Sequence, residues 1–415
     1  MTSQPLPLSA TTPIICNRPE AQLVAMTPRE RILATLAHKE PDKVPLTARF
    51  WLDTRIKLRE YYGVKGDLDR QGSITALSYT LADEELYRKM GIDNPMTTVT
   101  RLMPEGWTPT PEYLSFCKAT GYEPESEYAN FEDYGIRRTL GAKGNSALQQ
   151  YFFTHHPWES FTTPIQVEDA KLPDLEAPGR FKKTEKKLQE KKDSYLVMGG
   201  LGHVLWTKGW ELRGMLTLMK DLHTNPEMTE AILNKLTDYG CRLAEKLLDL
   251  GCDGLSLSED WGNNYSLFTS PDLWRKYFKP RYKKLFNQAK RRGKLVYFHS
   301  DGNITPIVGD LVEIGADILN PLQPECIDQL DIKKRYGSRI TIDTGISNQK
   351  TLPFGTVDDV KRETLHALKH LAPGGGFVYG TSHYAMYEVP VENIVALYET
   401  CKKYGNYPIK IPDQT

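Results

Sequence analysis

The sequence predicts an α/β protein built as a (β/α)8 TIM barrel, with an N-terminal extension and an inserted excursion. After residue 195, apolar strand segments alternate with amphipathic helices over five consecutive units, which is the pattern of parallel strands covered by helices. Polar groups recur where these strands end, as they do at the mouth of a barrel. A doubly wound sheet is the alternative, but no GxGxxG motif opens the first unit.

The composition excludes several classes of protein. The chain has 415 residues, of which 40% are hydrophobic and 26% charged, so we expect a soluble globular fold. Basic and acidic residues both number 53, which leaves no positive field for a nucleic acid or an anionic membrane. Six cysteines without a CxxC pair favour reduced thiols, and no apolar run is long enough to span a membrane. These features predict a cytoplasmic protein.

The expected domain organisation is simple. Residues 1–25 form an extension, and residues 26–410 form a single barrel domain with a less regular insertion at about 95–195. The first helix is expected at 28–38, because Thr27 can cap it, Pro28 suits its first turn and Glu30 completes a capping box. The strand candidate VPLTARFWL follows, with Arg49 near its end.

The insertion contains two informative segments. The charged run KKTEKKLQEKKD is typical of a solvated helix face. The aromatic segment QQYFFTHHPWESF either packs as a hairpin or covers a pocket. Further along, Pro280 is expected to kink or divide the helix that begins after Ser270.

The stretch YFHSDGNI carries the strongest chemical signal. His299 and Asp301 are two positions apart near a strand end, so on a regular strand their side chains point the same way. Such a pair can bind a divalent metal, exchange a proton, or serve as a structural hydrogen-bonded pair. Cys326 and His383 follow neighbouring strands and would complete a zinc set. Taken alone, Cys326 is more typical of a buried or loop thiol than of a ligand, and His383 fits a core position as well as a site.

Other polar or aromatic residues are expected at the same mouth. Of the adjacent Glu259 and Asp260, only one should face the pocket, and we favour Asp260. Asp343 is a second candidate for proton transfer. Trp261 would form an apolar wall if it does not simply pack in the core. The candidate substrate-binding residues are Arg49, Trp261, Asn320 and Gln323.

Several of these segments resemble the uroporphyrinogen decarboxylase superfamily. The resemblance rests on TPRERILATLAHKEPDKVPL, SEDWGNN, the stretch from SPDLWRKYF to FHSDGNI, and GTVDDVKRETLHALKHLAPGGGFVYGTSHYAM. It is strong over about 195–400, has an anchor at 27–53 and is weak between 95 and 195. It implies a single (β/α)8 barrel with its site at the C-terminal mouth. It also implies either decarboxylation of uroporphyrinogen or cobalamin-dependent methyl transfer, often with zinc.

The sequence departs from both branches. The decarboxylases carry an Arg-Gln-Ala-Gly-Arg motif that pairs with substrate carboxylates, whereas here PLTARFWLDTR offers Arg49 as the nearest candidate. The zinc methyltransferases show His-x-Cys, whereas here the triplet is His299-Ser300-Asp301. An oxygen ligand makes the metal a harder Lewis acid, which suits an oxygen-bound methyl group better than a thiol acceptor.

We therefore expect a methyltransferase that moves a methyl group from a small methoxylated compound, with aromatic compounds included, to a corrinoid. The corrinoid is expected on a separate protein, because the chain has no DxHxxG-type cobalamin motif. The expected metal is zinc, held by His299, Asp301 and either Cys326 or His383, with Asp260 or Asp343 handling a proton. A metal-free decarboxylase and a non-catalytic barrel that docks a corrinoid protein are the alternatives. A homodimer is left open.

Overall fold

The computed structural model describes residues 25–65, 83–101, 103–120, 133–140 and 151–412. The extension expected at 1–25 lies outside these residues except for its last position. Within the described ranges, no helix combines the length and apolar character that crossing a membrane requires.

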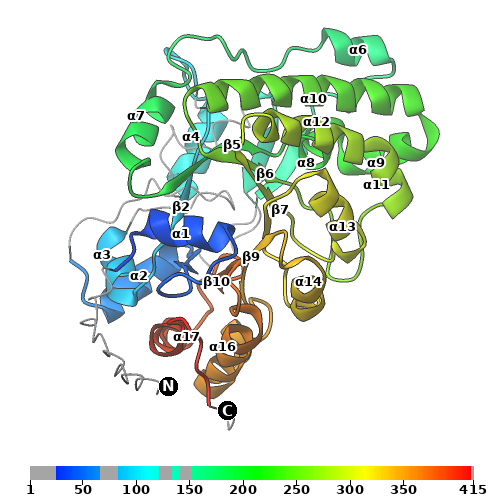
Figure 1. Ribbon diagram of the computed structural model, residues 1–415. Coiled ribbons are helices and arrows are strands. Elements are labelled where there is room, and N and C mark those ends of the chain that lie inside the picture. The colour runs from blue at the N-terminus through cyan, green and yellow to red at the C-terminus, as the bar shows by residue number, and fades with distance from the viewer. Residues whose placement is uncertain (1–24, 66–82, 102, 121–132, 141–150, 413–415) are drawn as a thin grey trace, which may run out of the picture.

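Eight parallel strands form one curled sheet, which confirms the (β/α)8 prediction. Their spatial order is β1-β10-β9-β8-β7-β6-β5-β2, so chain order and spatial order agree except that the first strand lies beside the last. Figure 1 shows the helices arranged around these strands. The strands are β1 (Leu46–Thr47), β2 (Met96–Val99), β5 (Leu196–Gly202), β6 (Gly254–Ser258), β7 (Leu295–His299), β8 (Ile318–Asn320), β9 (Thr341–Ile346) and β10 (Phe377–Thr381).

The two end strands, β1 and β2, are joined through Asp93 and Asn94, which lie just before Pro95 and β2. The N–H groups of Asp93 and Asn94 donate to the carbonyl oxygen of Leu46 at 3.0 and 2.9 Å. In return, the Asp93 carboxylate accepts the N–H of Leu46 at 3.1 Å, and the Asn94 side-chain oxygen accepts that of Ala48 at 2.9 Å. Backbone and side-chain hydrogen bonds therefore together join the two end strands at this seam.

Helices cover the outside of the sheet. α10, α12 and α13 lie over β5, β6 and β7, and α16 and α17 lie over the last strands (Figure 1). As expected at Pro280, one predicted helix is divided in two, α11 and α12. The helices are α1 (Pro28–Leu36), α2 (Leu52–Tyr61), α3 (Glu84–Met90), α4 (Pro111–Thr120), α6 (Pro164–Asp169), α7 (Lys182–Lys191), α8 (Trp206–Arg213), α9 (Met215–Thr224), α10 (Pro226–Asp249), α11 (Pro271–Tyr277), α12 (Lys279–Lys290), α13 (Thr305–Ile314), α14 (Gln329–Tyr336), α15 (Thr351–Phe354), α16 (Val357–Leu371) and α17 (Val391–Tyr404).

Helix α1 lies at the N-terminal ends of the strands, which we call the lower end of the barrel. It has the predicted capping box of Thr27 and Glu30. From it, Arg29 donates two hydrogen bonds of 2.7 Å to Asp253, which in turn accepts the N–H of Val197 at 2.8 Å. Because Asp253 directly precedes β6, this contact fixes α1 against two neighbouring strands.

The insertion predicted at about 95–195 begins with β2, so it contributes one strand to the barrel. The charged run is helix α7, in which Thr184 and Leu188 are buried and most of the lysines are exposed. The aromatic segment forms β4 (Tyr151–His155), which pairs antiparallel with β3 (Arg137–Leu140). The hairpin interpretation of this segment is therefore confirmed.

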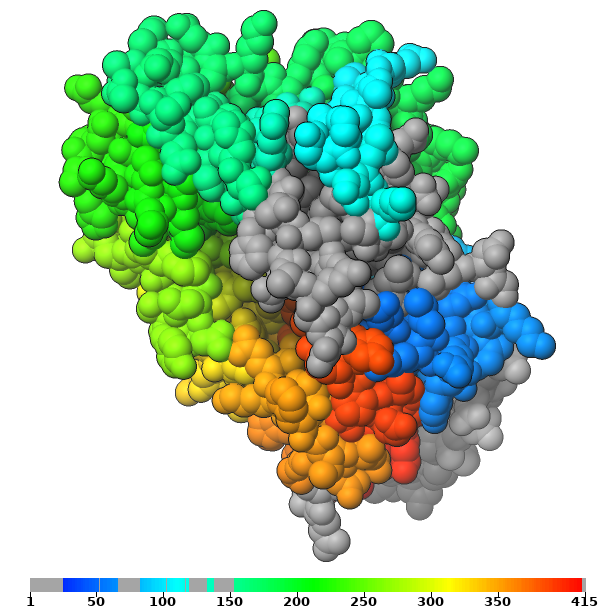
Figure 2. All heavy atoms as spheres, turned by 180° about the vertical axis from the view of Figure 1, so that it is seen from behind, coloured from blue at the N-terminus to red at the C-terminus, as the bar shows by residue number. Residues whose placement is uncertain are grey.

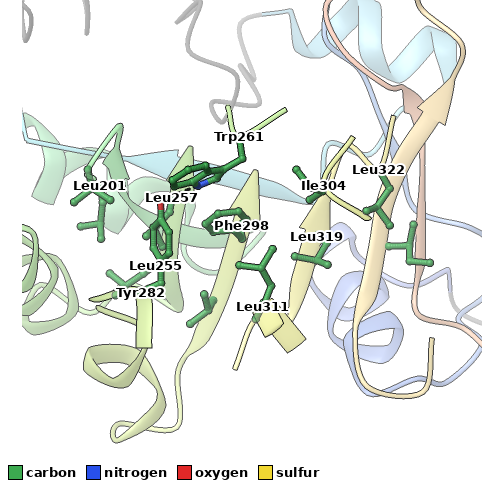
Figure 3. Packing of buried hydrophobic residues seen from close by; sticks show 14 of the residues in the cluster. Leu201, Leu255, Leu257, Trp261, Tyr282, Phe298, Ile304, Leu311, Leu319 and Leu322 are labelled. Carbon is green, nitrogen blue, oxygen red and sulfur yellow. Dashed lines mark hydrogen bonds between the residues drawn. The ribbon is translucent and has the colours of Figure 1, made fainter. Parts of the chain in front are cut away.

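Alternate strand residues face two different cores. Leu255, Leu257, Phe298 and Leu319 pack outward against helix residues such as Tyr282 and Leu311 (Figure 3). A smaller cluster fills the barrel interior and includes Ile32 of α1 at the lower end; its other buried members are Met96, Leu196, Met198, Tyr297, Ile318 and Val378. Since His299 is two residues after Tyr297, the strand alternation directs it to the interior above this cluster.

The segments that follow β1 and β10 meet beside the mouth. Figure 2 shows blue residues of the N-terminal part directly beside orange-red residues that follow β10. Phe50 forms a parallel bridge with Ala385, and the rings of Trp51 and Tyr384 lie 5.5 Å apart.

Candidate metal centre at the barrel mouth

His299, the last residue of β7, is buried and held by one specific neighbour. Its Nδ1 lies 2.7 Å from the side-chain oxygen of Asn320 on the adjacent strand β8. The Asn320 amide nitrogen donates to the carbonyl oxygen of Asp343 at 2.9 Å, so its oxygen is the atom that faces the imidazole. Nδ1 therefore carries a proton, and Nε2 is the ring nitrogen that is not bound to Asn320.

Two carboxylates lie around that nitrogen. His299 Nε2 is 3.7 Å from Asp301 Oδ1 and 3.7 Å from Asp260 Oδ1, and Asp301 Oδ2 is 3.5 Å from His383 Nε2. One ligand atom from each of His299, Asp301 and His383 lies within 4.8 Å of the others. Three of the four predicted metal ligands are thus brought together.

The charges of this group suit a cation. Burial would raise the pKa of Asp301, but His383, His299 and Arg49 outweigh it, so that the pKa lies below its usual value and the carboxylate is ionised. Burial lowers the pKa of His383, which favours the neutral imidazole. Among the residues that the structure describes, no donor hydrogen-bonds to the buried Oδ1 of Asp301. A buried carboxylate oxygen without a donor is costly, and a bound cation would satisfy it.

The donor set fits a divalent transition metal. Two imidazole nitrogens and one carboxylate oxygen match the three-ligand sets of catalytic zinc sites, which keep a further position open. Neutral imidazole and ionised carboxylate are also the protonation states that metal binding requires.

Cys326, the fourth predicted ligand, lies outside this three-residue group. Its thiol sulfur is 3.6 Å from the side-chain oxygen of Asn264. Burial, with the nearby charges of Glu325 and Asp301, raises the pKa of the thiol to about 11. A protonated thiol is a poor metal ligand, so this geometry favours His383 over Cys326.

The adjacent carboxylates Glu259 and Asp260 go to different places. The Glu259 carboxylate accepts N–H groups of Val204, Leu205 and Thr207 at 2.6–3.2 Å, and burial raises its pKa despite these donors. Asp260 lies at the mouth, where its Oδ1 accepts the N–H of Asp301 at 3.3 Å. As the alternation predicted, only Asp260 faces the candidate site.

Arg49 and Asp343 form a buried ion pair beneath the metal group. Arg49 Nη2 is 3.1 Å from Asp343 Oδ2, which also accepts the Tyr297 hydroxyl at 2.7 Å. The side chain of Arg49 is 3% exposed and that of Asp343 is fully buried. The structure therefore places Arg49, predicted to bind substrate, and Asp343, predicted to transfer a proton, below the mouth. There the two side chains bind each other.

Trp261 and Gln323 also have structural partners. The Trp261 indole is fully buried and donates to the Tyr282 hydroxyl at 3.0 Å (Figure 3). It also stacks on Trp206, with the ring centres 4.8 Å apart. It belongs to the core, as the packing alternative expected. Gln323 accepts the N–H of Gly302 at 3.2 Å and so holds the loop that carries Asp301.

Sequence analysis missed a second polar group at the mouth. His203 follows β5 directly, and its Nδ1 lies 2.6 Å from Glu211 Oε1, while Glu211 Oε2 binds Lys208. The signal was present, because His203 follows an apolar strand in GGLGH as His299 does in LVYFH.

Comparison with known proteins adds the family. The model of the family described as uroporphyrinogen decarboxylase (URO-D) matches residues 159–404, which is more than half of the chain. The chain belongs to the uroporphyrinogen decarboxylase family. This confirms the resemblance that the sequence motifs suggested.

Within the URO-D family, the similar curated proteins are distant. The uroporphyrinogen decarboxylase of Coxiella burnetii is 20% identical over 204 residues, which cover 48% of this chain and 54% of that protein. That of Pelodictyon phaeoclathratiforme is 23% identical over 190 residues, covering 44% and 51%. The chain thus spans about half the length of the curated relatives it matches.

One solved structure covers nearly the whole fold. A methyltransferase from Methanosarcina mazei superposes with a TM-score of 0.62 at 20% identity, covering 91% of this chain and 99% of that one. At this identity the match establishes a shared fold.

Proposed function

We propose that this URO-D family protein is a methyltransferase that takes a methyl group from a small methoxylated compound and passes it to a corrinoid carried by a separate protein. The observation that carries the proposal is the group of His299, Asp301 and His383, whose ligand atoms lie within 4.8 Å at the barrel mouth. The methyltransferase with the same fold supports it by analogy.

A zinc ion held by His299, Asp301 and His383 would act as a Lewis acid on the ether oxygen of the methyl donor. The protein's own residues prepare this site. Asn320 fixes the imidazole of His299 with Nε2 toward the mouth, and the two carboxylates there exclude a bound anion. Asp260, with a side chain 44% exposed, is the carboxylate that can exchange a proton with the substrate.

The buried state of Arg49 argues against the decarboxylase alternative. Uroporphyrinogen has eight carboxylates, which need several free cationic partners on the protein. Arg49, the residue nearest to the decarboxylase arginines, is already bound to Asp343 and Tyr297. The carboxylates of Asp260 and Asp301 would also repel such a substrate.

The test combines metal analysis with an activity assay. Purified protein, a His299→Ala variant and a His366→Ala control are analysed for bound metal by mass spectrometry. His366 is an exposed histidine on α16, so its removal leaves the mouth intact. We expect about one zinc per chain in the wild type and the control, and a large loss in His299→Ala.

The same three proteins are then mixed with a cobalt(I) corrinoid protein and a panel of methoxy compounds. Methylation of the corrinoid, followed by its visible spectrum, is expected for the wild type and the control. Carbon dioxide release from uroporphyrinogen would favour the decarboxylase alternative. Metal binding without methyl transfer to any corrinoid would contradict the proposed reaction while leaving the metal site in place.

A further inference from the structure

Trp51, which follows β1 in the chain, lies on the side of the strand that faces the barrel interior. Two residues earlier, Arg49 reaches Asp343 inside the barrel. Between them, Phe50 packs outward against Tyr398, with the ring centres 6.0 Å apart. The backbone is still extended at Trp51, with φ −62° and ψ 159°. Side chains of an extended segment alternate between its two sides, so Trp51 points the same way as Arg49, one step nearer the mouth.

Trp51 is kept apart from the hydrophobic cores of the protein. It is partly exposed, whereas Trp206, Trp261 and Trp274 are fully buried members of the outer core. Within the described residues, Trp51 neither belongs to one of the two core clusters nor packs against one. The same holds for Tyr384, although its side chain is buried. Large aromatic side chains that stay outside the core at a barrel mouth indicate a binding surface.

Tyr384 connects Trp51 to the metal group. The rings of Trp51 and Tyr384 lie 5.5 Å apart and are tilted by 45°. The Tyr384 ring lies 5.3 Å from the ring of His383, in an edge-to-face arrangement with an angle of 78°. His383 Nε2 is in turn 3.5 Å from Asp301 Oδ2. The three aromatic rings therefore form a continuous run that begins at Trp51 and ends at the metal group.

The backbone fixes these rings relative to one another. The Trp51 N–H donates to the carbonyl oxygen of Ala385 at 3.2 Å, and the Thr54 hydroxyl donates to the same oxygen at 2.9 Å. In return, the Ala385 N–H donates to the carbonyl oxygen of Arg49 at 2.8 Å. Because Ala385 directly follows Tyr384, the rings of Trp51 and Tyr384 are held in place before any ligand binds. Such preorganisation lowers the conformational cost of binding.

We propose that Trp51 binds the aromatic ring of the methyl donor, so that the donor is an aryl methyl ether. The inference rests on the proposed methyl transfer. The indole supplies a flat apolar surface on which an arene stacks. Because two ring contacts separate Trp51 from His383, an arene on the indole can extend its methoxy group toward the metal centre. Trp51 thus provides the apolar wall that the sequence suggested for Trp261.

The rival ligand for such a surface is a cation. A quaternary ammonium group also binds the face of an indole, and the carboxylates of Asp260 and Asp301 would attract it. Sites of that kind surround the cation with several aromatic rings. Among the residues that the structure describes, Trp51 has a single ring neighbour, Tyr384. This arrangement suits a flat ligand, which needs only one face of the indole.

The experiment compares the binding of anisole with that of its saturated counterpart, methoxycyclohexane, by calorimetric titration. The proteins are the wild type, Trp51→Leu, Trp51→Phe and a Tyr61→Leu control. Tyr61 is an exposed aromatic residue at the opposite end of α2, where its ring contacts Tyr62. Loss of stacking should weaken anisole binding about 3- to 10-fold in Trp51→Leu, and methoxycyclohexane binding by less than about twofold. Trp51→Phe should keep most of the affinity for anisole, and the control should keep all of it.

The same proteins are then assayed for methyl transfer from anisole to a cobalt(I) corrinoid protein. Because Trp51 holds the ring and not the reacting bond, KM should rise in Trp51→Leu by the factor seen in binding. The value of kcat should stay within about threefold of the wild type. Zinc content and urea unfolding are measured for each variant, and wild-type values show that the variant is intact.

The outcomes separate this inference from the proposed function. Equal losses for anisole and methoxycyclohexane, or no preference of the wild type for anisole, would overturn the role of Trp51 and leave the methyl transfer standing. Displacement of anisole by tetramethylammonium at a lower concentration than by phenol would assign the surface to a cation and overturn the aromatic donor. Anisole binding that depends on Trp51, without methyl transfer to any corrinoid, would support the aromatic site and overturn the proposed reaction.

Discussion

At the lower end of the barrel, Arg29 and Arg31 bind their carboxylates at 2.6–2.8 Å, whereas at the mouth His299 and His383 lie 3.5–3.7 Å from theirs. Both ends bury charge, but His299, Asp301 and His383 at the mouth lie too far apart for direct hydrogen bonds between them. At the mouth, within the described part of the chain, a buried oxygen of Asp301 accepts no hydrogen bond.

This difference indicates that the charges at the two ends have different functions. Paired charges at the lower end stabilise the attachment of α1 to the strands, while the loosely spaced groups at the mouth leave room for a ligand. Removing a lower-end charge should therefore cost stability and leave binding intact, and removing a mouth residue should do the reverse.

The largest expected effect on stability is that of Arg31→Ala. Arg31 is nearly buried and donates to Asp42 at 2.6 and 2.7 Å and to Asp93 at 2.8 Å. Its loss leaves two carboxylates without their main cation, so the free energy of unfolding should fall by about 3–5 kcal/mol in urea titrations. Zinc content at low temperature should remain that of the wild type. A variant with the same free energy of unfolding as the wild type would contradict this difference between the two ends.

The ion pair of Glu211 and His203 at the mouth should stabilise the fold, as the ion pairs at the lower end do. The pKa of Glu211 is about 2, below its usual 4.5, so its ionised form stabilises the fold above about pH 4.5, and this contribution disappears as pH falls toward 2. His203 has a raised pKa, so its contribution is present below about pH 6.5 and is lost as pH rises through the raised value. The pair stabilises most between these limits.

Glu211→Gln measures this contribution. In urea unfolding, the stability difference from the wild type should be greatest between about pH 5 and 6.5, on the order of 3 kcal/mol, and should shrink on acidification. A difference that does not vary with pH would show that Glu211 acts by packing alone.

Asn320→Ala should weaken metal binding without large loss of fold. The alanine cannot hold the Nδ1 proton of His299, so the imidazole loses its fixed orientation. Loss of such a supporting contact typically costs 10–100-fold in metal affinity, measurable by competition with a zinc chelator. Unchanged affinity would mean that another contact orients the ring.

The smallest effect is expected for Cys326→Ser. The thiol lies outside the three-residue metal group and is held protonated, so the zinc affinity of the variant should stay within about threefold of the wild type. A loss as large as that of Asn320→Ala would return Cys326 to the ligand set that the sequence suggested.

The fold could be read from the sequence because its signals are local. Capping at Thr27, the break at Pro280 and the alternation of strands and helices each depend on a few neighbouring residues. The metal group was predicted in part for the same reason, since His299 and Asp301 are neighbours in sequence and His383 follows a clear strand. The strand order then placed them at one mouth.

The sequence does not show which partner each of these side chains contacts. Arg49 and Asp343 are 294 positions apart, and nothing local shows that they neutralise one another below the mouth. Trp261 fitted both a pocket wall and a core position, and nothing local shows that its partner is Tyr282, on a helix outside the sheet. His203 was overlooked because its support, Glu211, is on the next helix.

The position of β1 between the seam and β10 has a consequence for synthesis on the ribosome. Asp93 and Asn94 can bind β1 early in synthesis. Its partner strand is β10, in which Tyr379 lies opposite Leu46, and this strand is made more than 300 residues later. At the usual pace of translation this interval lasts tens of seconds. His383 emerges just after that partner strand, so the group of His299, Asp301 and His383 is complete only when more than nine-tenths of the chain has been made. Under the proposed function, a metal could therefore be held by all three ligands only at the end of synthesis.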